Sequence, residues 1–184
     1  GVVCCALSWA CWKTYLGRPE RNRVQLSAMS VLGNGLDDAE HFEDALSVQE
    51  ADLAMRRRLG VSEHNILITQ NNIATTNFKL GRHEEALRIE QDVYSGWLKL
   101  EGREHQKTLT AANNYADTLV NLKRFEEAKS LMLKMIPVAR RALGKGHRLT
   151  LKMRLNYAQT LYMNCTSATL NDLHESVTTL EDTA

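Results

Sequence analysis

The sequence predicts an all-α fold, a solenoid of antiparallel helix pairs. A first observation is that Asn71-Asn72-Ile73-Ala74 returns 42 residues later as Asn113-Asn114-Tyr115-Ala116, and again 42 residues later as Leu155-Asn156-Tyr157-Ala158. Self-similarity at a period of about 20 to 50 residues is typical of solenoid proteins. A second is that apolar residues recur at helical spacing along the chain, which holds only two prolines. No stretch has the alternating pattern of a strand.

The first third of the chain is the less regular part. A helix is predicted over residues 3–16, and a second helix over residues 24–32. Gly33-Asn34-Gly35 should end the second helix, because Gly and Asn tolerate the left-handed conformation found at helix C-termini. Asp37 and Asp38 should then cap a third helix over about 39–58, since carboxylates accept hydrogen bonds from free backbone N–H groups.

From residue 60 onward the helices follow the repeat. They are predicted at 66–80, 83–99, 108–122, 125–143, 149–163 and about 170–182. A small residue recurs within them, at Ala45, Ala74, Ala86, Ala116, Ala128, Ala158 and, in the last helix, Ser176. Small side chains let two helix backbones approach closely, so these positions should be buried helix crossings.

These patterns divide the chain into a short N-terminal segment and an array. Residues 1–19 are interpreted as an N-terminal helix that is the remnant of a preceding repeat. Residues 20–184 are interpreted as one array, with repeats at about 20–60, 61–101, 102–144 and 145–184. Because the chain opens on Gly1 and closes within a helical pattern, we expect it to be a segment of a longer protein.

Composition excludes several classes of function. The net charge of +1 provides no global field for nucleic acid or anionic membrane. The apolar run of residues 1–7 is too short to span a bilayer. Of the four cysteines, three cluster at Cys4, Cys5 and Cys11, which is not a disulfide framework. We therefore expect a cytoplasmic protein with no membrane contact.

The turn and linker residues resemble the tetratricopeptide repeat. The turn Gly81-Arg82-His83-Glu84-Glu85-Ala86 is of that type, and the linkers Leu59-Gly60 to His64, Leu100 to His105 and Leu143-Gly144 to His147 are similar to those of kinesin light chains. The period of 42 residues, rather than the common one of about 34, fits this variant. The resemblance implies a right-handed superhelix whose first helices line a concave face. It covers residues 59–163 well, and 22–58 and 164–184 more loosely.

Polar residues on the first helix of each repeat are the candidate binding site. Asn114, Asp117 and Asn121 lie on one helical face, turned away from Ala116. The resemblance gives the second Asn of each pair a peptide-binding role, because a side-chain amide both donates and accepts hydrogen bonds. The full candidate set is Asn72, Thr75, Lys79, Asn114, Asp117, Asn121, Asn156 and Gln159. The alternative is that these Asn residues bridge neighbouring helices.

Other polar and aromatic residues have ordinary explanations. Lys79, Lys152 and Arg154 could favour an acidic peptide. Arg56-Arg57-Arg58 and Arg140-Arg141 close helices, where cations meet the negative end of the dipole. Trp97 is either an exposed anchor or a packed lid on the linker. Asn77 replaces an apolar residue and should be loose or locally hydrogen-bonded.

No motif for chemistry is present. His64, His105 and His147 recur with the repeat and none has metal-ligand spacing to Cys or a carboxylate. There is no phosphate-binding loop after a strand and no nucleophile elbow. We expect no metal, no cofactor and no enzymatic activity. RNA binding would need a basic groove, which Asp117 and the low net charge oppose.

The sequence therefore predicts a non-catalytic protein-interaction module or adaptor. It would bind a linear peptide of a protein partner on the concave face, in the manner of a kinesin light chain-like cargo adaptor. The alternative is a structural, assembly or regulatory segment that packs on another domain of its own longer chain.

Overall fold

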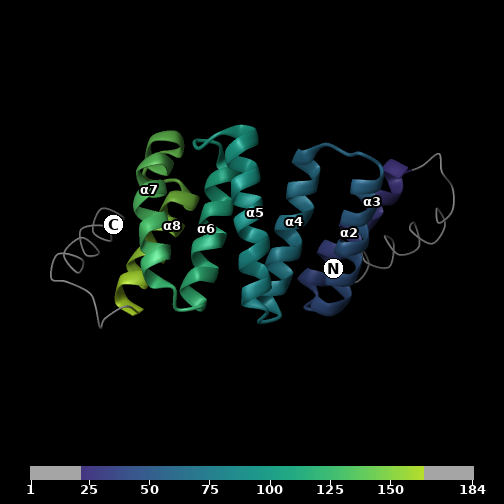
Figure 1. Ribbon diagram of the computed structural model, residues 1–184, viewed down its shortest axis with the longest axis horizontal. Helices are drawn as coiled ribbons and strands as arrows, with labels where there is room; N and C mark the ends of the chain where they lie inside the picture. The colour runs from purple at the N-terminus through teal and green to yellow at the C-terminus, as the bar shows by residue number, and fades with distance from the viewer. Residues whose placement is uncertain (1–21, 164–184) are drawn as a thin grey trace. The chain divides into compact units, whose positions relative to one another are not determined.

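The structure is a computed structural model that describes residues 22–163, and every element in that range is an α-helix (Figure 1). The helices follow one another with short turns and linkers. They are α2 (Asn22–Asp38), α3 (Phe42–Arg58), α4 (Glu63–Lys79), α5 (His83–Glu101), α6 (Gln106–Asn121), α7 (Phe125–Leu143) and α8 (Arg148–Met163). The predicted helices at 3–16 and 170–182, and with them Ser176, lie outside the described residues.

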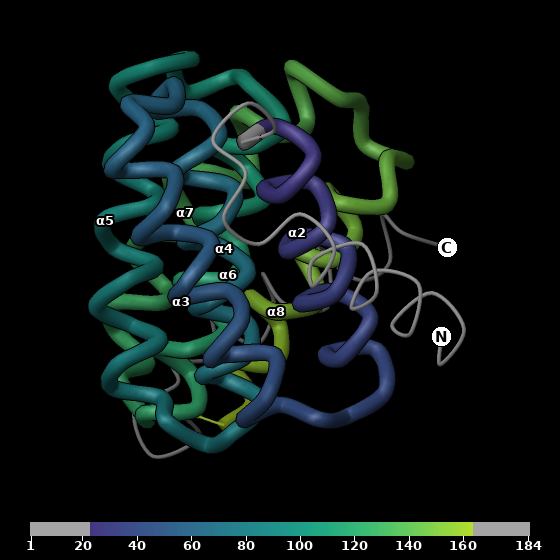
Figure 2. The backbone as a smooth tube through the Cα atoms, turned by 90° about the vertical axis from the view of Figure 1, so that its right-hand side faces the viewer, coloured from purple at the N-terminus to yellow at the C-terminus, as the bar shows by residue number. Residues whose placement is uncertain are grey.

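The chain divides between Ile89 and Glu90 into two compact units. In the first unit α2 packs on α3 and α3 on α4, and the hairpin of α2 and α3 is visible in Figure 2. In the second unit α6 packs on α7 and α7 on α8. The first helices of successive pairs also meet within each unit, α2 with α4 and α6 with α8. This is the packing of an all-α solenoid built from helix pairs.

The turn inside each pair is the same. Glu40, Gly81 and Lys123 all have positive φ, at 63°, 75° and 60°. In each turn the next N–H reaches back five residues, as from Arg82 to the carbonyl of Asn77 at 2.9 Å and from Arg124 to that of Leu119 at 2.8 Å. These are Schellman motifs, which satisfy the free carbonyls of a helix C-terminus.

The predicted end of the second helix is wrong. Helix α2 continues through Gly33-Asn34-Gly35 to Asp38. Gly33 is buried against α3, where an added Cβ would lie 3.1 Å from Cγ of Gln49 and 3.6 Å from Cγ1 of Val48. Gly33 is thus the small residue at the α2–α3 crossing, and this tertiary contact outweighs the local turn signal.

The predicted N-cap role of Asp37 and Asp38 is also wrong, because both lie in the last turn of α2. His41 precedes α3 and makes no capping hydrogen bond through its side chain. Glu43 and Asp44 in the first turn of α3 are the acidic residues that complement its dipole.

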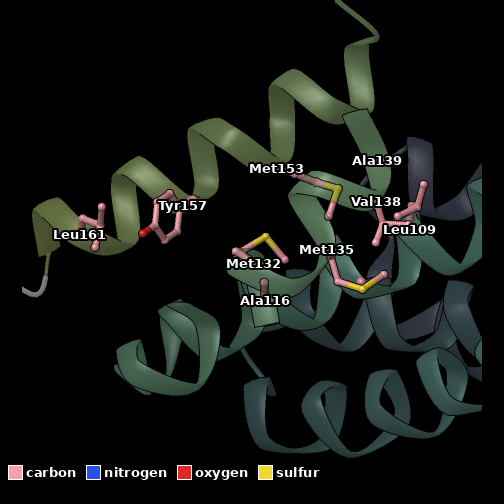
Figure 3. Packing of buried hydrophobic residues seen from close by; sticks show 10 residues of the cluster. Leu109, Ala116, Met132, Met135, Val138, Ala139, Met153, Tyr157 and Leu161 are labelled. Carbon is pink, nitrogen blue, oxygen red and sulfur yellow. The ribbon is translucent and has the colours of Figure 1, made fainter. Parts of the chain in front are cut away.

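The predicted small residues do lie in the core. Ala45, Ala86, Ala116 and Ala128 are fully buried, and the remaining alanines of the repeat, Ala74 and Ala158, are buried as well. In the second unit larger side chains interlock around them. Met132, Met135 and Met153 meet Leu109 and Tyr157 there, as Figure 3 shows. Burial of this apolar surface is the main source of stability of such a unit.

Two further expectations can be compared with the fold. Asn77 is buried, and its amide donates to the carbonyl of Ile73 in its own helix at 3.0 Å, so it is locally hydrogen-bonded as expected. None of the helices between residues 22 and 163 is long and apolar enough to cross a bilayer.

Candidate functional site

Two of the predicted residues, Asn72 and Thr75, line one polar pocket on the first helices of the first unit. Both come from α4, one turn apart on the same face. The pocket has a volume of about 300 Å³. Its lining consists of amides, carboxylates and a hydroxyl, from Asn34, Asp37, Asp38, Gln49, Asn72 and Thr75.

Hydrogen bonds between α2, α3 and α4 fix this lining. Nδ2 of Asn72 donates to Oδ1 of Asn34 at 3.1 Å. The buried hydroxyl of Thr76 lies within 3.1 Å of Oδ1 of Asp37, Oε1 of Gln49 and the carbonyl oxygen of Asn72. The hydroxyl of Thr75 donates to the carbonyl of Asn71 in its own helix at 2.9 Å. The pocket is therefore preorganised by contacts that its own walls make.

Lys79, the third predicted residue of this unit, lies at the end of α4. Its ammonium is 2.5 Å from Oδ2 of Asp37 and 5.3 Å from the centre of the Phe42 ring. Asp37 thus neutralises the charge of Lys79. Lys79 is therefore a weak candidate for a selective contact with an acidic peptide.

In the second unit the predicted residues Asp117 and Asn121 are linked along α6. Nδ2 of Asn121 donates to the backbone carbonyl of Asp117 at 2.8 Å. The pKa of Asp117 is raised above its ordinary value by burial. Two contacts oppose this shift: the ammonium of Lys152, which lies 3.4 Å away, and a hydrogen bond from Asn156. Asn114, on the same helix, is half-buried and engaged in contacts of its own.

Asn156 is a structural bridge between first helices. Its side chain is 7% exposed, and its Nδ2 donates to Oδ1 of Asn113 on α6 at 2.8 Å. Asn113 is itself only 1% exposed. Gln159, one turn further along α8, is exposed. From the sequence, the repeated Asn is expected either to contact a peptide or to bridge neighbouring helices. Asn156 is a bridge, whereas Asn72 both bridges to Asn34 and lines the pocket.

Sequence reasoning missed Asn34, Asp37, Asp38 and Gln49 as members of the pocket. The reason is the misplaced end of α2, which put the first three in a loop. A signal was present: Gly33 precedes Ala74 by 41 residues, the same spacing as between Ala45 and Ala86. That register makes Gly33 a crossing residue and places Asn34 in the position of Thr75 and Asp117, the residues that follow Ala74 and Ala116.

The remaining candidates have structural roles. Trp97 is 3% exposed and lies under the ammonium of Lys107, 4.8 Å from the ring centre, which matches a packed lid on the linker. Arg56 is bound to Asp52 and to the hydroxyl of Ser30. Arg154 is buried, so it does not offer a cation to a peptide.

Helix α5 carries a buried carboxylic acid that is not among the predicted site residues. Glu90 on α5 is 4% exposed, and its Oε2 is buried with no hydrogen-bond partner. Its pKa is raised to about 7, chiefly by burial; the neighbouring hydroxyl of Thr118 lowers the pKa, and the charge of Asp117 raises it. Over residues 22–163 no group of three or more His, Cys, Asp and Glu side chains is arranged to hold a metal ion.

Comparison with known proteins identifies the repeat. Residues 65–132 match the family model of the tetratricopeptide repeat. A comparison with curated protein sequences finds no match.

Solved structures of kinesin light chain-type repeat proteins have the same fold. A Podosopora anserina protein of this type, with nearly identical TPR-like repeats, is 18% identical with a TM-score of 0.82 over 97% of this chain and 82% of its own. BtubC (BKLC) from P. vanneervenii is 17% identical with a TM-score of 0.78 over 98% and 70% of the two chains. The apo form of RapI is more distant, at 13% identity and a TM-score of 0.68 over 97% and 73%. Residues 65–132 therefore match the tetratricopeptide repeat, and the chain has the fold of the kinesin light chain-type repeat proteins.

Proposed function

We propose that the chain is a non-catalytic protein-interaction module that binds linear peptide on the polar faces of its first helices, which are α2 and α4 in the first unit and α6 and α8 in the second. The repeat fold supports the coarse part of this statement, because helix-pair solenoids present repeated surfaces to protein partners. The pocket on α2 and α4 carries the finer part, since it gathers Asn72 and Thr75 with four further polar residues.

The chemistry of this pocket suits an extended peptide. An extended backbone offers N–H and C=O groups at regular intervals, and each needs a partner when it leaves water. Asn34 is exposed, and the structure shows its Oδ1 accepting from Asn72 while no bond is formed by its Nδ2 within the described part of the chain. Asn34 can thus donate to a peptide carbonyl, and the carboxylates of the pocket can accept from a peptide N–H.

In the second unit the proposed contacts are Asn114, Asp117, Asn121 and Gln159. These side chains lie on the polar faces of α6 and α8, and Gln159 is exposed. Asn156 supports that face from within, through its bond to Asn113. The proposal therefore gives Asn156 a positioning role rather than a direct contact with the peptide.

A peptide selection tests this proposal. A random linear library displayed on phage is panned against the purified chain, and the affinity of a fluorescein-labelled enriched peptide is measured by anisotropy. We expect a micromolar dissociation constant, roughly −8 kcal/mol. The double substitution Asn34→Ala/Thr75→Ala should weaken binding by about thirtyfold, because two polar contacts of order 1 kcal/mol each are lost.

The matched control is Glu50→Ala, which changes an exposed side chain on α3 outside the pocket. Circular dichroism should show the same helical content in all variants. Equal affinity of the double variant and the wild type would exclude this face as the site, and a library that yields no binder would count against a linear-peptide function altogether.

A further inference from the structure

We infer that the pocket on α2 and α4 takes a cationic side chain, lysine or arginine, from the bound peptide. This inference rests on the proposed peptide-binding function and adds a specificity to it. It runs against the expectation from sequence that lysines on the first helices favour an acidic peptide. Three properties of the pocket carry it: its charge, its surplus of acceptors and its size.

The pocket has a net negative charge. Two carboxylates, Asp37 and Asp38, belong to its lining, and no lysine or arginine does. Lys79 lies beside the pocket and matches the charge of Asp37. Asp38 is exposed, and no ion pair or hydrogen bond to it is formed within residues 22–163. One carboxylate therefore remains uncompensated at the rim, where it attracts a cation.

The pocket also holds more acceptors than donors. The hydroxyl of Thr76 has one proton, but three oxygens lie within 3.1 Å of it, on Asp37, Gln49 and the backbone of Asn72. Only one of the three can receive that proton, so it cannot satisfy both Oδ1 of Asp37 and Oε1 of Gln49, two residues that line the pocket. A ligand that supplies N–H donors satisfies this site, and ammonium and guanidinium are the charged side-chain groups that donate without accepting.

Gln49 provides an independent pointer to a ligand. Its side chain is 5% exposed, yet it lines the pocket rather than the packed interior. Within the described part of the chain only its Oε1 forms a hydrogen bond, to Thr76. Its Nε2 forms no such bond within that part and is open to the pocket, where an acceptor on a ligand can reach it. A peptide carbonyl next to the cationic residue would accept from this amide.

The size of the pocket fits one long side chain. At about 300 Å³ it lies at the lower limit of pockets that enclose small ligands, so it admits a side chain but not a folded element. Lysine and arginine bury their aliphatic stems and keep the charged head near acceptors. An acidic residue would meet Asp37, Asp38 and the surplus oxygens with like charge, which opposes its entry.

The test uses the intact chain and peptides that have been selected on it from the random library. Enriched peptides should share a lysine or arginine at one position. The parent peptide is compared with versions in which this residue is glutamine or glutamate, on the wild type, on Asp38→Asn and on the charge-matched control Glu50→Gln. On the wild type we expect the glutamine peptide to bind about tenfold more weakly and the glutamate peptide more weakly still.

Coupling between peptide and pocket is the decisive readout. On Asp38→Asn the parent peptide should lose about fivefold to tenfold in affinity, and the change to glutamine should then have little further effect, as in a double-mutant cycle. Binding to Glu50→Gln should equal binding to the wild type. Raising the salt concentration should weaken the parent peptide more than the glutamine peptide, because salt screens the charge pair.

Failure of this inference is distinguishable from failure of the proposed function. If selected peptides depend on Asn34 and Thr75 but lack a shared cation, or bind Asp38→Asn as tightly as the wild type, then the peptide site stands and the cation specificity is wrong. If no peptide is enriched, both are wrong.

Discussion

At Asn156 a side-chain amide donates to Asn113, and both residues are almost fully buried. The corresponding amide of Asn72 donates to Asn34 at the rim of a pocket. The same residue at the same repeat position therefore serves the fold in one place and borders a candidate site in another. Sequence spacing identifies the helix face on which an Asn lies, but the depth of burial depends on which neighbours the next helix presents.

Replacement of Asn156 by alanine should destabilise the fold. The change leaves Oδ1 of Asn113 buried without its donor, and an unsatisfied buried polar group costs about 1–3 kcal/mol. Urea denaturation followed by circular dichroism measures the loss. Gln159→Ala, an exposed change on the same helix, is the control and should alter stability by less than about 0.5 kcal/mol. Equal stability of Asn156→Ala and Gln159→Ala would contradict the bridging role of Asn156.

Glu90 makes stability depend on pH. Its pKa in the folded chain is about 7, above the ordinary value of 4.5 for an exposed glutamate. Between these two values the folded chain keeps a proton that the unfolded chain has lost, so stability falls as pH rises through this window and the loss is complete above about pH 7. Glu90→Gln should remove this loss and stabilise the chain at pH 8 by about 2–3 kcal/mol relative to wild type.

Urea titrations of wild type and Glu90→Gln at pH 4.5 and pH 8 check this prediction. The difference between the two proteins should be small at pH 4.5 and large at pH 8. A difference that does not change with pH would show that Glu90 titrates like an exposed acid.

At the scale of elements, the sequence predicts the helix ends of the regular repeats, but it does not predict the end of α2 in the first repeat. Helix α7, Phe125–Leu143, begins and ends where the apolar pattern predicts, and α8 differs from its prediction by one residue. Helix α2 runs six residues past its predicted end. Gly33-Asn34-Gly35 is a strong local stop signal, and the close approach of Gly33 to Gln49 and Val48 on α3 favours the continued helix. Local sequence does not contain that contact.

The crossing at Gly33 predicts that a larger residue will not fit. An added Cβ already approaches Cγ of Gln49 to 3.1 Å and the carbonyl oxygen of Ala45 to 3.9 Å. Gly33→Leu should therefore force α2 away from α3 and lower the free energy of unfolding by about 1–3 kcal/mol. Ala54→Leu, on an exposed position of α3, is the control and should have little effect. A Gly33→Leu protein as stable as wild type, by urea denaturation, would show that α2 does not pack as described.

At the scale of the whole molecule, the repeat predicted the fold and the positions of its buried alanines, because a fixed period constrains every helix at once. The candidate site can be compared with the sequence at single positions. Asn72 and Thr75 lie together in the pocket, but the carboxylates Asp37 and Asp38 that determine its charge were assigned to a helix cap. A prediction of ligand chemistry therefore needed the correct length of α2, and that length depends on a tertiary contact.

The most direct test of peptide binding by the first helices is a map of the contact on the chain itself. Amide ¹H–¹⁵N spectra of the labelled chain are recorded while a library-selected peptide is titrated in. Peptide binding at the pocket should shift the resonances of residues 34–38 and 72–79, and should leave the exposed surface of α3 near Glu50 unchanged. Shifts confined to the second helices α3, α5 and α7, with none in 34–38 or 72–79, would contradict the account.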